Sequence, residues 1–192
     1  MPYFPVFLDL KGKEVVVAGG GPVAERKVKK LLPFEPNIKV IAPRVTDGIK
    51  ELNRKEKIRL ILRRVRLSDI KGAFLVIAAL DDLKLQKRLY EYCKKKGILC
   101  NTVDNIEYCS FIFPALVVKD DVVIGISTSG KVPALSRALR EYIERSLPKN
   151  IEEIAFRLDR LRKSLPKGKE RQEKLKDLAL RMVFTSLPQQ DI

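Results

Sequence analysis

Three consecutive glycines near the start of the chain are the residues best suited to bind a ligand. Residues 15–24 read Val-Val-Val-Ala-Gly-Gly-Gly-Pro-Val-Ala, so an apolar run ends in the glycines and a helical pattern follows. Gly19, Gly21 and Ala24 fit the frame G-x-G-x-x-G/A. In that frame the first residue allows a tight turn, the second lets backbone N–H groups approach a phosphate, and the small third packs helix against strand. The spacing predicts a dinucleotide pyrophosphate site.

Acidic residues follow two of the predicted strands. Asp81 and Asp82 come after an apolar run, beside the expected cofactor cleft, but either could instead cap the helix that begins at Leu83. Asp104 lies in Asn-Thr-Val-Asp-Asn after the next strand, where parallel sheets bind ligands. Asp-Asn is also ordinary turn chemistry, so both interpretations of Asp104 stay open from spacing alone.

Hydroxyl groups and a lysine precede a later helix. Ser127, Thr128, Ser129 and Lys131 stand just before Pro133, a residue that suits the first turn of a helix. This arrangement could hold a carboxylate or a phosphate. The alternative is that Ser129 caps the helix and binds no ligand.

The second predicted strand lacks the acid that usually holds the ribose hydroxyls of a dinucleotide. Ala42, Pro43 and Arg44 occupy that place. Arg44 could pair with a 2′-phosphate, which would favour NADP, or lie against the adenine. The residues alone leave this choice open.

Composition excludes several chemistries. The chain has no histidine, which rules out histidine metal ligands, Ser-His or Cys-His nucleophiles and imidazole acid–base catalysis. Cys93, Cys100 and Cys109 show no ligand spacing and are interpreted as small buried side chains, so we expect no metal site. The net charge of +15 is spread along the chain without an RNA-binding signature, so a basic surface that attracts a polyanionic small molecule is preferred to nucleic-acid binding.

Strand and helix patterns alternate through the first hundred residues. Short apolar runs predict strands at residues 14–18, 38–42, 58–62, 74–79 and 99–103. Amphipathic segments predict helices at residues 23–32, 47–54 and 83–96, with Pro33 stopping the first of them. This alternation predicts an α/β fold, a Rossmann domain with an open parallel sheet that binds ligands beyond the carboxyl ends of its strands.

The pattern changes after residue 105. Residues 111–118 and 122–127 are predicted to pair as antiparallel strands, and helices are predicted at 133–146, 151–165 and 169–184. We therefore predict three parts: a dinucleotide-binding domain at 1–113, a strand-strand-helix module at 114–147 and a helical tail at 148–192. No apolar run is long enough for a transmembrane helix and no secretory signal is recognisable, so we expect a cytoplasmic protein with no membrane partner.

Six stretches, in order along the first 145 or so residues, resemble one enzyme family. They are residues 5–13, 17–27, 73–82, 101–104, 111–115 and 126–139. Together they resemble the precorrin-2 dehydrogenases, the siroheme-synthase enzymes that oxidise precorrin-2 to sirohydrochlorin. The helical tail is similar only in character.

The resemblance implies NAD as cofactor, with Gly19, Gly21, Pro22 and Val23 along its pyrophosphate and Pro43 and Arg44 near its adenosine ribose. This argues against the NADP interpretation of Arg44. Asp104 matches the aspartate of the family's Asn-x-Val-Asp motif, which is implicated in catalysis. The resemblance also implies a homodimer in which residues 114–147 make most of the contact.

A mechanism follows as a hypothesis. The substrate loses a hydride to NAD and a proton to Asp104, which Asn101 or Thr102 would orient. Its carboxylates would meet the basic surface and the loop at 127–131. Some relatives also insert iron into sirohydrochlorin, and this activity stays open here. The alternative function is a non-catalytic NAD-sensing domain.

Overall fold

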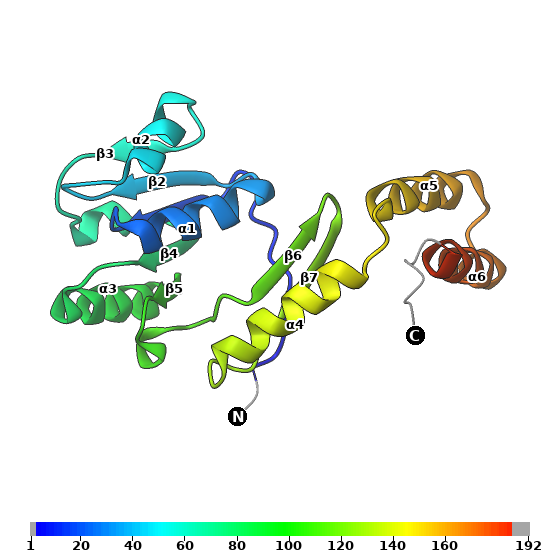
Figure 1. The fold of residues 1–192 in the computed structure, drawn as a ribbon. Coiled ribbons are helices and arrows are strands. Elements are labelled where there is room, and N and C mark those ends of the chain that lie inside the picture. The colour runs from blue at the N-terminus through cyan, green and yellow to red at the C-terminus, as the bar shows by residue number, and fades with distance from the viewer. Residues whose placement is uncertain (1–2, 186–192) are drawn as a thin grey trace. The chain divides into compact units, whose positions relative to one another are not determined.

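The structure is a computed structural model that describes residues 3–185, and it divides the chain into two compact units (Figure 1). The first unit, the sheet unit, runs from Val6 to Phe113. The second, the hairpin-and-helix unit, begins at Pro114 and also takes in residues 3–5.

The sheet unit is a five-stranded parallel sheet with helices on both faces. Its strands are β1 (Glu14–Ala18), β2 (Asn37–Ile41), β3 (Arg59–Ile61), β4 (Leu75–Ala78) and β5 (Leu99–Thr102), in the order β3-β2-β1-β4-β5. Its helices are α1 (Pro22–Leu31), α2 (Asp47–Arg54) and α3 (Leu83–Lys96). This is the strand order of a doubly wound nucleotide-binding fold, and it confirms the predicted fold class.

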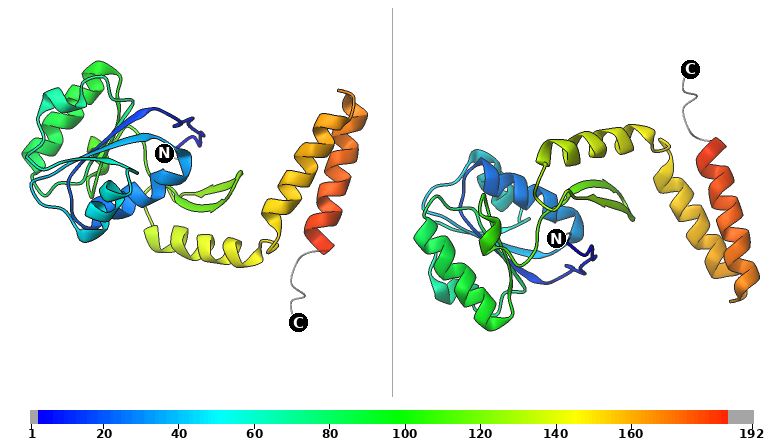
Figure 2. Two further views of the ribbon diagram at one scale, coloured as in Figure 1. Left: turned by 90° about the horizontal axis from the view of Figure 1, so that it is seen from above. Right: turned by 90° about the horizontal axis from the view of Figure 1, so that it is seen from below.

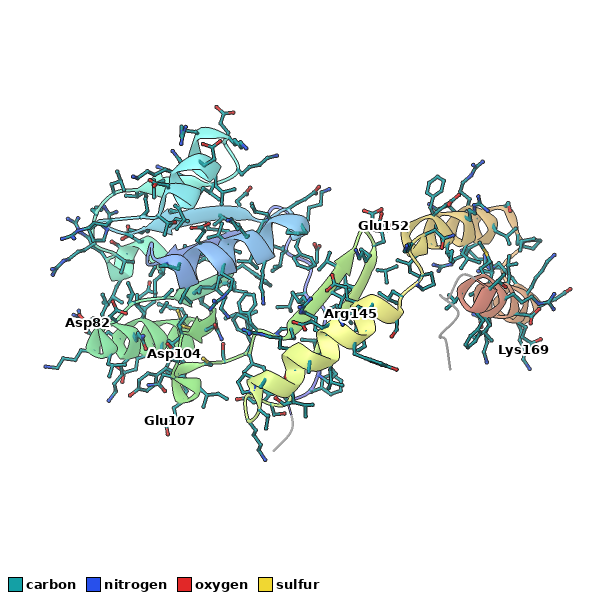
Figure 3. All side chains as sticks on the ribbon, in the orientation of Figure 1. Asp82, Asp104, Glu107, Arg145, Glu152 and Lys169 are labelled. Carbon is teal, nitrogen blue, oxygen red and sulfur yellow. The ribbon has the colours of Figure 1, made fainter. Side chains whose placement is uncertain are left out.

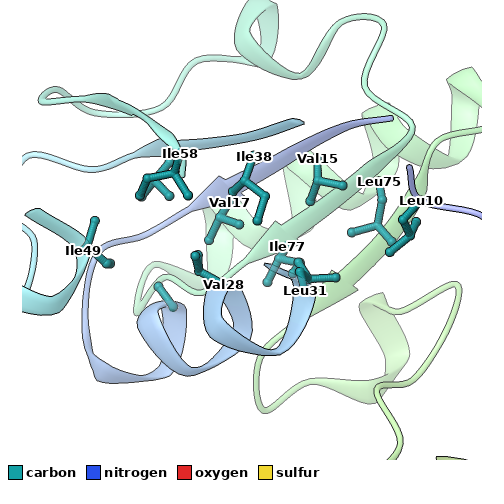
Figure 4. Close-up of a cluster of buried hydrophobic side chains, with 12 residues drawn as sticks. Leu10, Val15, Val17, Val28, Leu31, Ile38, Ile49, Ile58, Leu75 and Ile77 are labelled. Atoms are coloured by element: carbon teal, nitrogen blue, oxygen red, sulfur yellow. The ribbon is translucent and has the colours of Figure 1, made fainter. Parts of the chain in front are cut away.

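Strand β1 is buried on both of its faces, which explains its continuous apolar sequence. Val15 and Val17 pack in a cluster with side chains of α1 and α2, whereas Val16 and Ala18 pack in a second cluster with α3 (Figure 4 shows the first cluster). All four side chains are fully buried. Each buried valine contributes about 1.5 kcal/mol or more, so these two clusters fix the position of the sequence that follows β1.

Most boundaries lie within one residue of the sequence prediction, and two features of the boundaries have a clear physical reason. Helix α1 ends at Leu31, just before Pro33 and one residue earlier than predicted, and Pro33 itself lies in the 3₁₀ turn η1 (Leu32–Phe34). Proline is tolerated there since the first N–H groups of such a turn need no partner. The first hairpin strand begins at Ala115 rather than at residue 111, because Phe111 and Phe113 pack against the core of the sheet unit.

The hairpin-and-helix unit contains a two-stranded antiparallel sheet and three helices. Strands β6 (Ala115–Lys119) and β7 (Val122–Ile126) are joined by a two-residue turn in which Asp120 has φ 50°. Helix α4 (Pro133–Ser146) packs on this hairpin, and α5 (Ile151–Ser164) and α6 (Lys169–Thr185) lie side by side (Figure 2). None of the helices in the described part of the chain is long and apolar enough to cross a membrane.

Candidate functional site

The switch point of the sheet lies at the carboxyl ends of β1 and β4. From β1 the chain continues to β2 on one side, while β4 pairs with β1 on the other. The glycine loop follows β1 and residues 79–82 follow β4, and the two segments are tied down where they leave the sheet. The Gly19 N–H group donates to the Ile41 carbonyl at 3.0 Å, and the Ala79 N–H group donates to the Ala18 carbonyl at 2.7 Å. Open α/β sheets bind ligands at such a point.

The three glycines of the loop have different surroundings. Gly19 has φ +125°, and a Cβ atom there would lie 2.0 Å from the Ala79 carbonyl oxygen. At Gly20 a Cβ atom would lie 2.2 Å from the Arg44 carbonyl oxygen. At Gly21 it would meet nothing within 4 Å. The first two glycines therefore let neighbouring backbone segments pack closely, and only Gly21 faces open space.

Gly19 and Gly21 were predicted to belong to the site, whereas Gly20 was not. The carbonyl of Gly20 accepts a hydrogen bond from the Thr46 N–H group at 2.9 Å, which joins the loop to the start of α2. The glycine triplet was the signal for the role of Gly20, because the G-x-G frame allows any residue in the middle and this chain has glycine there.

The N-terminus of α1 has no side-chain cap. Its N-cap residue is Gly21, and Pro22 occupies the first turn. In the same unit Thr46 caps α2, and the Asp82 carboxylate caps α3 by accepting from the Leu85 N–H group at 3.0 Å. A helix start without such a cap offers N–H donors and a partial positive charge to an anion.

The small residue at the third position of the frame acts as predicted. Ala24 is fully buried in the cluster between α1 and the sheet, so the helix can lie close to β1. Val23 is half-buried beside it.

The remaining candidate cofactor-binding residues lie along the same edge of the sheet. The cap at α3 confirms the structural interpretation of Asp82, whose side chain is exposed (Figure 3). Pro43 and Arg44 are exposed and follow β2. Since the carboxyl ends of parallel strands share one edge, these residues lie on the side of the sheet that carries the glycine loop.

Asp104 is exposed in the turn between β5 and the 3₁₀ turn η3 (Ile106–Tyr108), as Figure 3 shows. Its φ of 63° is in the left-handed region, which aspartate tolerates better than most residues. The turn is held from within, because the Thr102 hydroxyl donates to the Asn105 carbonyl at 2.7 Å. The carboxylate is thus presented to solvent by a constrained backbone.

The buried polar residues of β5 have a structural role that the sequence analysis did not foresee. The Asn101 side-chain amide donates to the Phe111 carbonyl at 3.0 Å, and the thiol of Cys109 accepts from the Thr102 N–H group at 3.2 Å. Within residues 3–185, no hydrogen bond joins Asp104 to Asn101 or Thr102. Both side chains are engaged in folding the loop back onto β5, and their role in orienting Asp104 stays a prediction.

Lys27 is a polar residue of this region that the sequence analysis did not single out. Its Nζ atom lies 3.9 Å from the centre of the Phe113 ring. The pKa of Lys27 is lowered to about 8, mainly by burial and to a smaller extent by the charges of Lys30 and Arg26, while Cys109 and Asp104 oppose the shift. The sequence did contain a signal that Lys27 has no ion-pair partner on its own helix, because its neighbours at i−4 and i+4 are Val23 and Leu31 and not carboxylates.

The loop at residues 127–131 belongs to the hairpin-and-helix unit. The Thr128 hydroxyl accepts from the Val132 N–H group at 3.2 Å and lies 3.1 Å from the Ser136 hydroxyl. Ser129 has φ 54°, and its hydroxyl accepts from the Tyr3 N–H group at 3.3 Å. The N-cap of α4 is Val132, so the interpretation of Ser129 as the helix cap is wrong.

Two side chains of that loop remain accessible. The Ser127 hydroxyl accepts from the Ser129 N–H group at 2.9 Å, and Ser127 and Lys131 are both exposed. They stay candidate ligands for an anion.

Comparison with known proteins agrees with this geometry. Residues 6–115 match the family described as "Putative NAD(P)-binding". The siroheme synthase of Blochmanniella pennsylvanica is 41% identical over 155 residues, which are 81% of this chain and 32% of that protein. Siroheme synthase 1 of Klebsiella pneumoniae subsp. pneumoniae is 40% identical over 157 residues, 81% of this chain and 33% of that protein. The chain thus spans about a third of the length of these curated relatives.

A solved structure is similar over nearly the whole chain. The precorrin-2 dehydrogenase SirC superposes with a TM-score of 0.75 at 26% sequence identity, covering 92% of this chain and 89% of that one. Nothing in these comparisons favours a regulatory NAD-sensing domain.

Proposed function

This chain belongs to the NAD(P)-binding family that its residues 6–115 match, and we propose that it oxidises precorrin-2 to sirohydrochlorin with NAD as the hydride acceptor. Two kinds of relative support the proposal: the siroheme synthases, and a precorrin-2 dehydrogenase whose fold matches over almost its full length. The observation that carries it is the uncapped start of α1 at Gly21, on the same sheet edge as Asp104.

The residues present fit a dinucleotide. Gly21 leaves space where a side chain would block a phosphate, and the first N–H groups of α1, beginning with Val23, are free of side-chain partners. Pro43 and Arg44 would lie near the adenosine ribose, and Asp82 would border the cleft while capping α3. When bound, NAD supplies the acceptor for the hydride that the substrate loses.

Asp104 is the proposed general base. Forming a carbon–carbon double bond removes one hydride and one proton, and in a chain without histidine the proton must pass to another group. A carboxylate oxygen of Asp104 would accept it. The exposed position of Asp104 suits this role, since the substrate can reach it, and the turn built on Thr102 holds it in place.

Anaerobic incubation with precorrin-2 and either NAD or NADP, followed by the tetrapyrrole absorption spectrum, tests the function and the cofactor together. We expect oxidation with NAD. Asp104→Asn should keep NAD affinity and lower turnover by about 100-fold, the scale of general-base loss, because asparagine tolerates the left-handed backbone. Activity near that of the wild type in this variant would remove Asp104 from the mechanism.

We further infer that the enzyme is a homodimer. Leu135, Leu139 and Tyr142 are large apolar side chains spaced at i, i+4 and i+7 on α4, and each is at least 39% exposed. A self-complementary contact would cover this face. Sedimentation should give a dimer for the wild type and a monomer for Leu139→Glu, and a wild-type monomer would contradict the inference.

A cytoplasmic location is also inferred. Cys93 and Cys100 are both fully buried, the neighbouring Cys100 thiol lowers the pKa of Cys93, and both cysteines are free. Free thiols in such proximity are typical of a reducing compartment. Cell fractionation would check this, and recovery in a membrane or secreted fraction would contradict it.

A further inference from the structure

Lys27 is fixed in place by the sheet unit. It lies on α1 between the buried residues Ala24 and Val28, and its ammonium group lies over the Phe113 ring. That ring is itself held, because Phe113 contacts Phe111 at a centroid distance of 5.5 Å and packs against the core. The long side chain therefore has a defined position and does not extend freely into water.

Lys27 is half-buried, and its ammonium has no counter-ion among the residues that the structure describes. No carboxylate lies within 4.0 Å of its Nζ atom in the part of the chain that the structure describes. By contrast, Lys29 on the same helix pairs with Glu25 at 2.5 Å. The contact with Phe113 compensates only in part for lost hydration, since a cation over an aromatic ring gains about 0.5–2 kcal/mol. A buried charge of this kind is unfavourable unless an anion joins it.

The charged and titratable groups that face Lys27 come from two places. Arg26 and Lys30 lie on α1, and Asp104 and Cys109 lie on the segment after β5. Asp104 thus acts on Lys27 through space but forms no ion pair with it.

We propose that Lys27 binds a carboxylate side chain of the tetrapyrrole substrate and so places the substrate beside Asp104. The inference rests on the proposed function, because it takes its ligand from the substrate named there. A carboxylate is favoured over a cofactor phosphate for two reasons. First, the phosphate site at Gly21 lies about 9 Å from Lys27 along the helix, at 1.5 Å per residue. Second, the charge of Asp104, the proposed base that must contact the substrate, raises the pKa of Lys27.

The test is equilibrium binding of sirohydrochlorin, the proposed product, which needs no turnover. Lys27→Met keeps an apolar stem against Phe113 and removes the charge, so we expect its dissociation constant to rise by about 10- to 100-fold, the scale of a charged hydrogen bond. Lys27→Arg should stay within about fivefold of the wild type. Lys29→Met, which removes a paired lysine from the same helix, is the matched control and should bind as the wild type does.

The pH dependence supplies a second readout. Lys27 binds an anion only when protonated, and the pKa of Lys27 in the free protein is about 8, so wild-type affinity should fall as the pH rises through about 8. Lys27→Met should lack this decline. Its thermal stability should match or exceed that of the wild type, because the variant removes an unpaired buried charge.

The outcomes separate the two proposals. Unchanged sirohydrochlorin affinity in Lys27→Met, with a wild type that oxidises precorrin-2, overturns the role of Lys27 alone. Weakened NAD binding with unchanged sirohydrochlorin affinity also overturns it and assigns the ammonium to a cofactor phosphate. A wild type that neither binds sirohydrochlorin nor oxidises precorrin-2 overturns both proposals.

Discussion

Replacing Gly21 by aspartate should make the fold more stable and strongly weaken NAD binding. Gly21 has φ −79° and ψ −176°, which any residue adopts without strain, and a side chain there would enter open space. Asp82 occupies the equivalent position of α3 with φ −80° and caps that helix. An aspartate at 21 should cap α1 in the same way, adding about 0.5–1 kcal/mol through the cap and the helix dipole.

The same carboxylate would stand where the pyrophosphate binds. Two negative charges about 4 Å apart repel by about 4 kcal/mol at an effective dielectric constant near 20, equivalent to about a 1000-fold loss of affinity. Allowing for salt screening, we expect NAD to bind at least about 100-fold more weakly. Titration calorimetry measures the affinity, and thermal unfolding measures the stability.

Two neutral variants separate the effect of the charge on NAD affinity from the effect of side-chain size. Gly21→Asn provides a cap of the same shape without charge, and Gly21→Ala adds only a methyl group. We expect NAD affinity to fall in the order Ala, Asn, Asp. If Gly21→Asp bound NAD as tightly as the wild type, the pyrophosphate could not lie at the start of α1. A lower melting temperature in Gly21→Asp would show that the position is not open.

Three further changes test the surrounding structure. Gly19→Ala should destabilise the fold by about 2–5 kcal/mol in denaturant unfolding, because residue 19 has a positive φ and the added methyl group would overlap the Ala79 carbonyl. A loss of stability below about 1 kcal/mol would refute this close approach. Asp82→Ala should cost about 1 kcal/mol through loss of the α3 cap while NAD affinity changes little, and a large loss of affinity would give Asp82 a direct cofactor contact. Asp69→Asn should destabilise the protein at neutral pH, since the Arg63 guanidinium beside Asp69, with N–O distances of 2.6 and 2.7 Å, lowers the pKa of that carboxyl in the folded state. Because that pKa is lowered in the folded state, the stabilisation is present above about pH 4 and is lost as the pH falls through the folded pKa. The free energies of unfolding of the wild type and Asp69→Asn should therefore become equal in acid. A difference between them that stays constant with pH would contradict the argument.

The amino-acid sequence was sufficient for the parts of the fold that depend on local patterns. The β1 strand, α2, α3 and α4 begin and end where composition and capping residues predict. Local signals also predicted the antiparallel pairing that β6 and β7 form. The errors lie where packing overrides local preference. Phe111 and Phe113 have strand-like sequence but fill the core of the sheet unit, and Pro33 fits a 3₁₀ turn that the sequence pattern does not distinguish from a helix end.

The candidate site also has features that the sequence predicted and features that depend on tertiary packing. Residue types alone predicted that a phosphate would meet a glycine loop and that the base could not be a histidine, because the chain has none. The choice of Asp104 as the base came from the family resemblance. Residue types could not separate Gly19, which a neighbouring carbonyl crowds, from Gly21, which faces open space. That difference depends on β4, nearly sixty residues further along the chain.

Only the tertiary structure decided which polar residues are available for chemistry. Asn101 and Thr102 are engaged in holding the loop after β5, and Asp82 caps a helix. Lys27, in contrast, is placed by folding against Phe113, far along the chain, with no carboxylate in contact among the residues that the structure describes. Sequence determines which groups a chain possesses, but burial and hydrogen bonding between distant segments determine which of them are left free to meet a ligand.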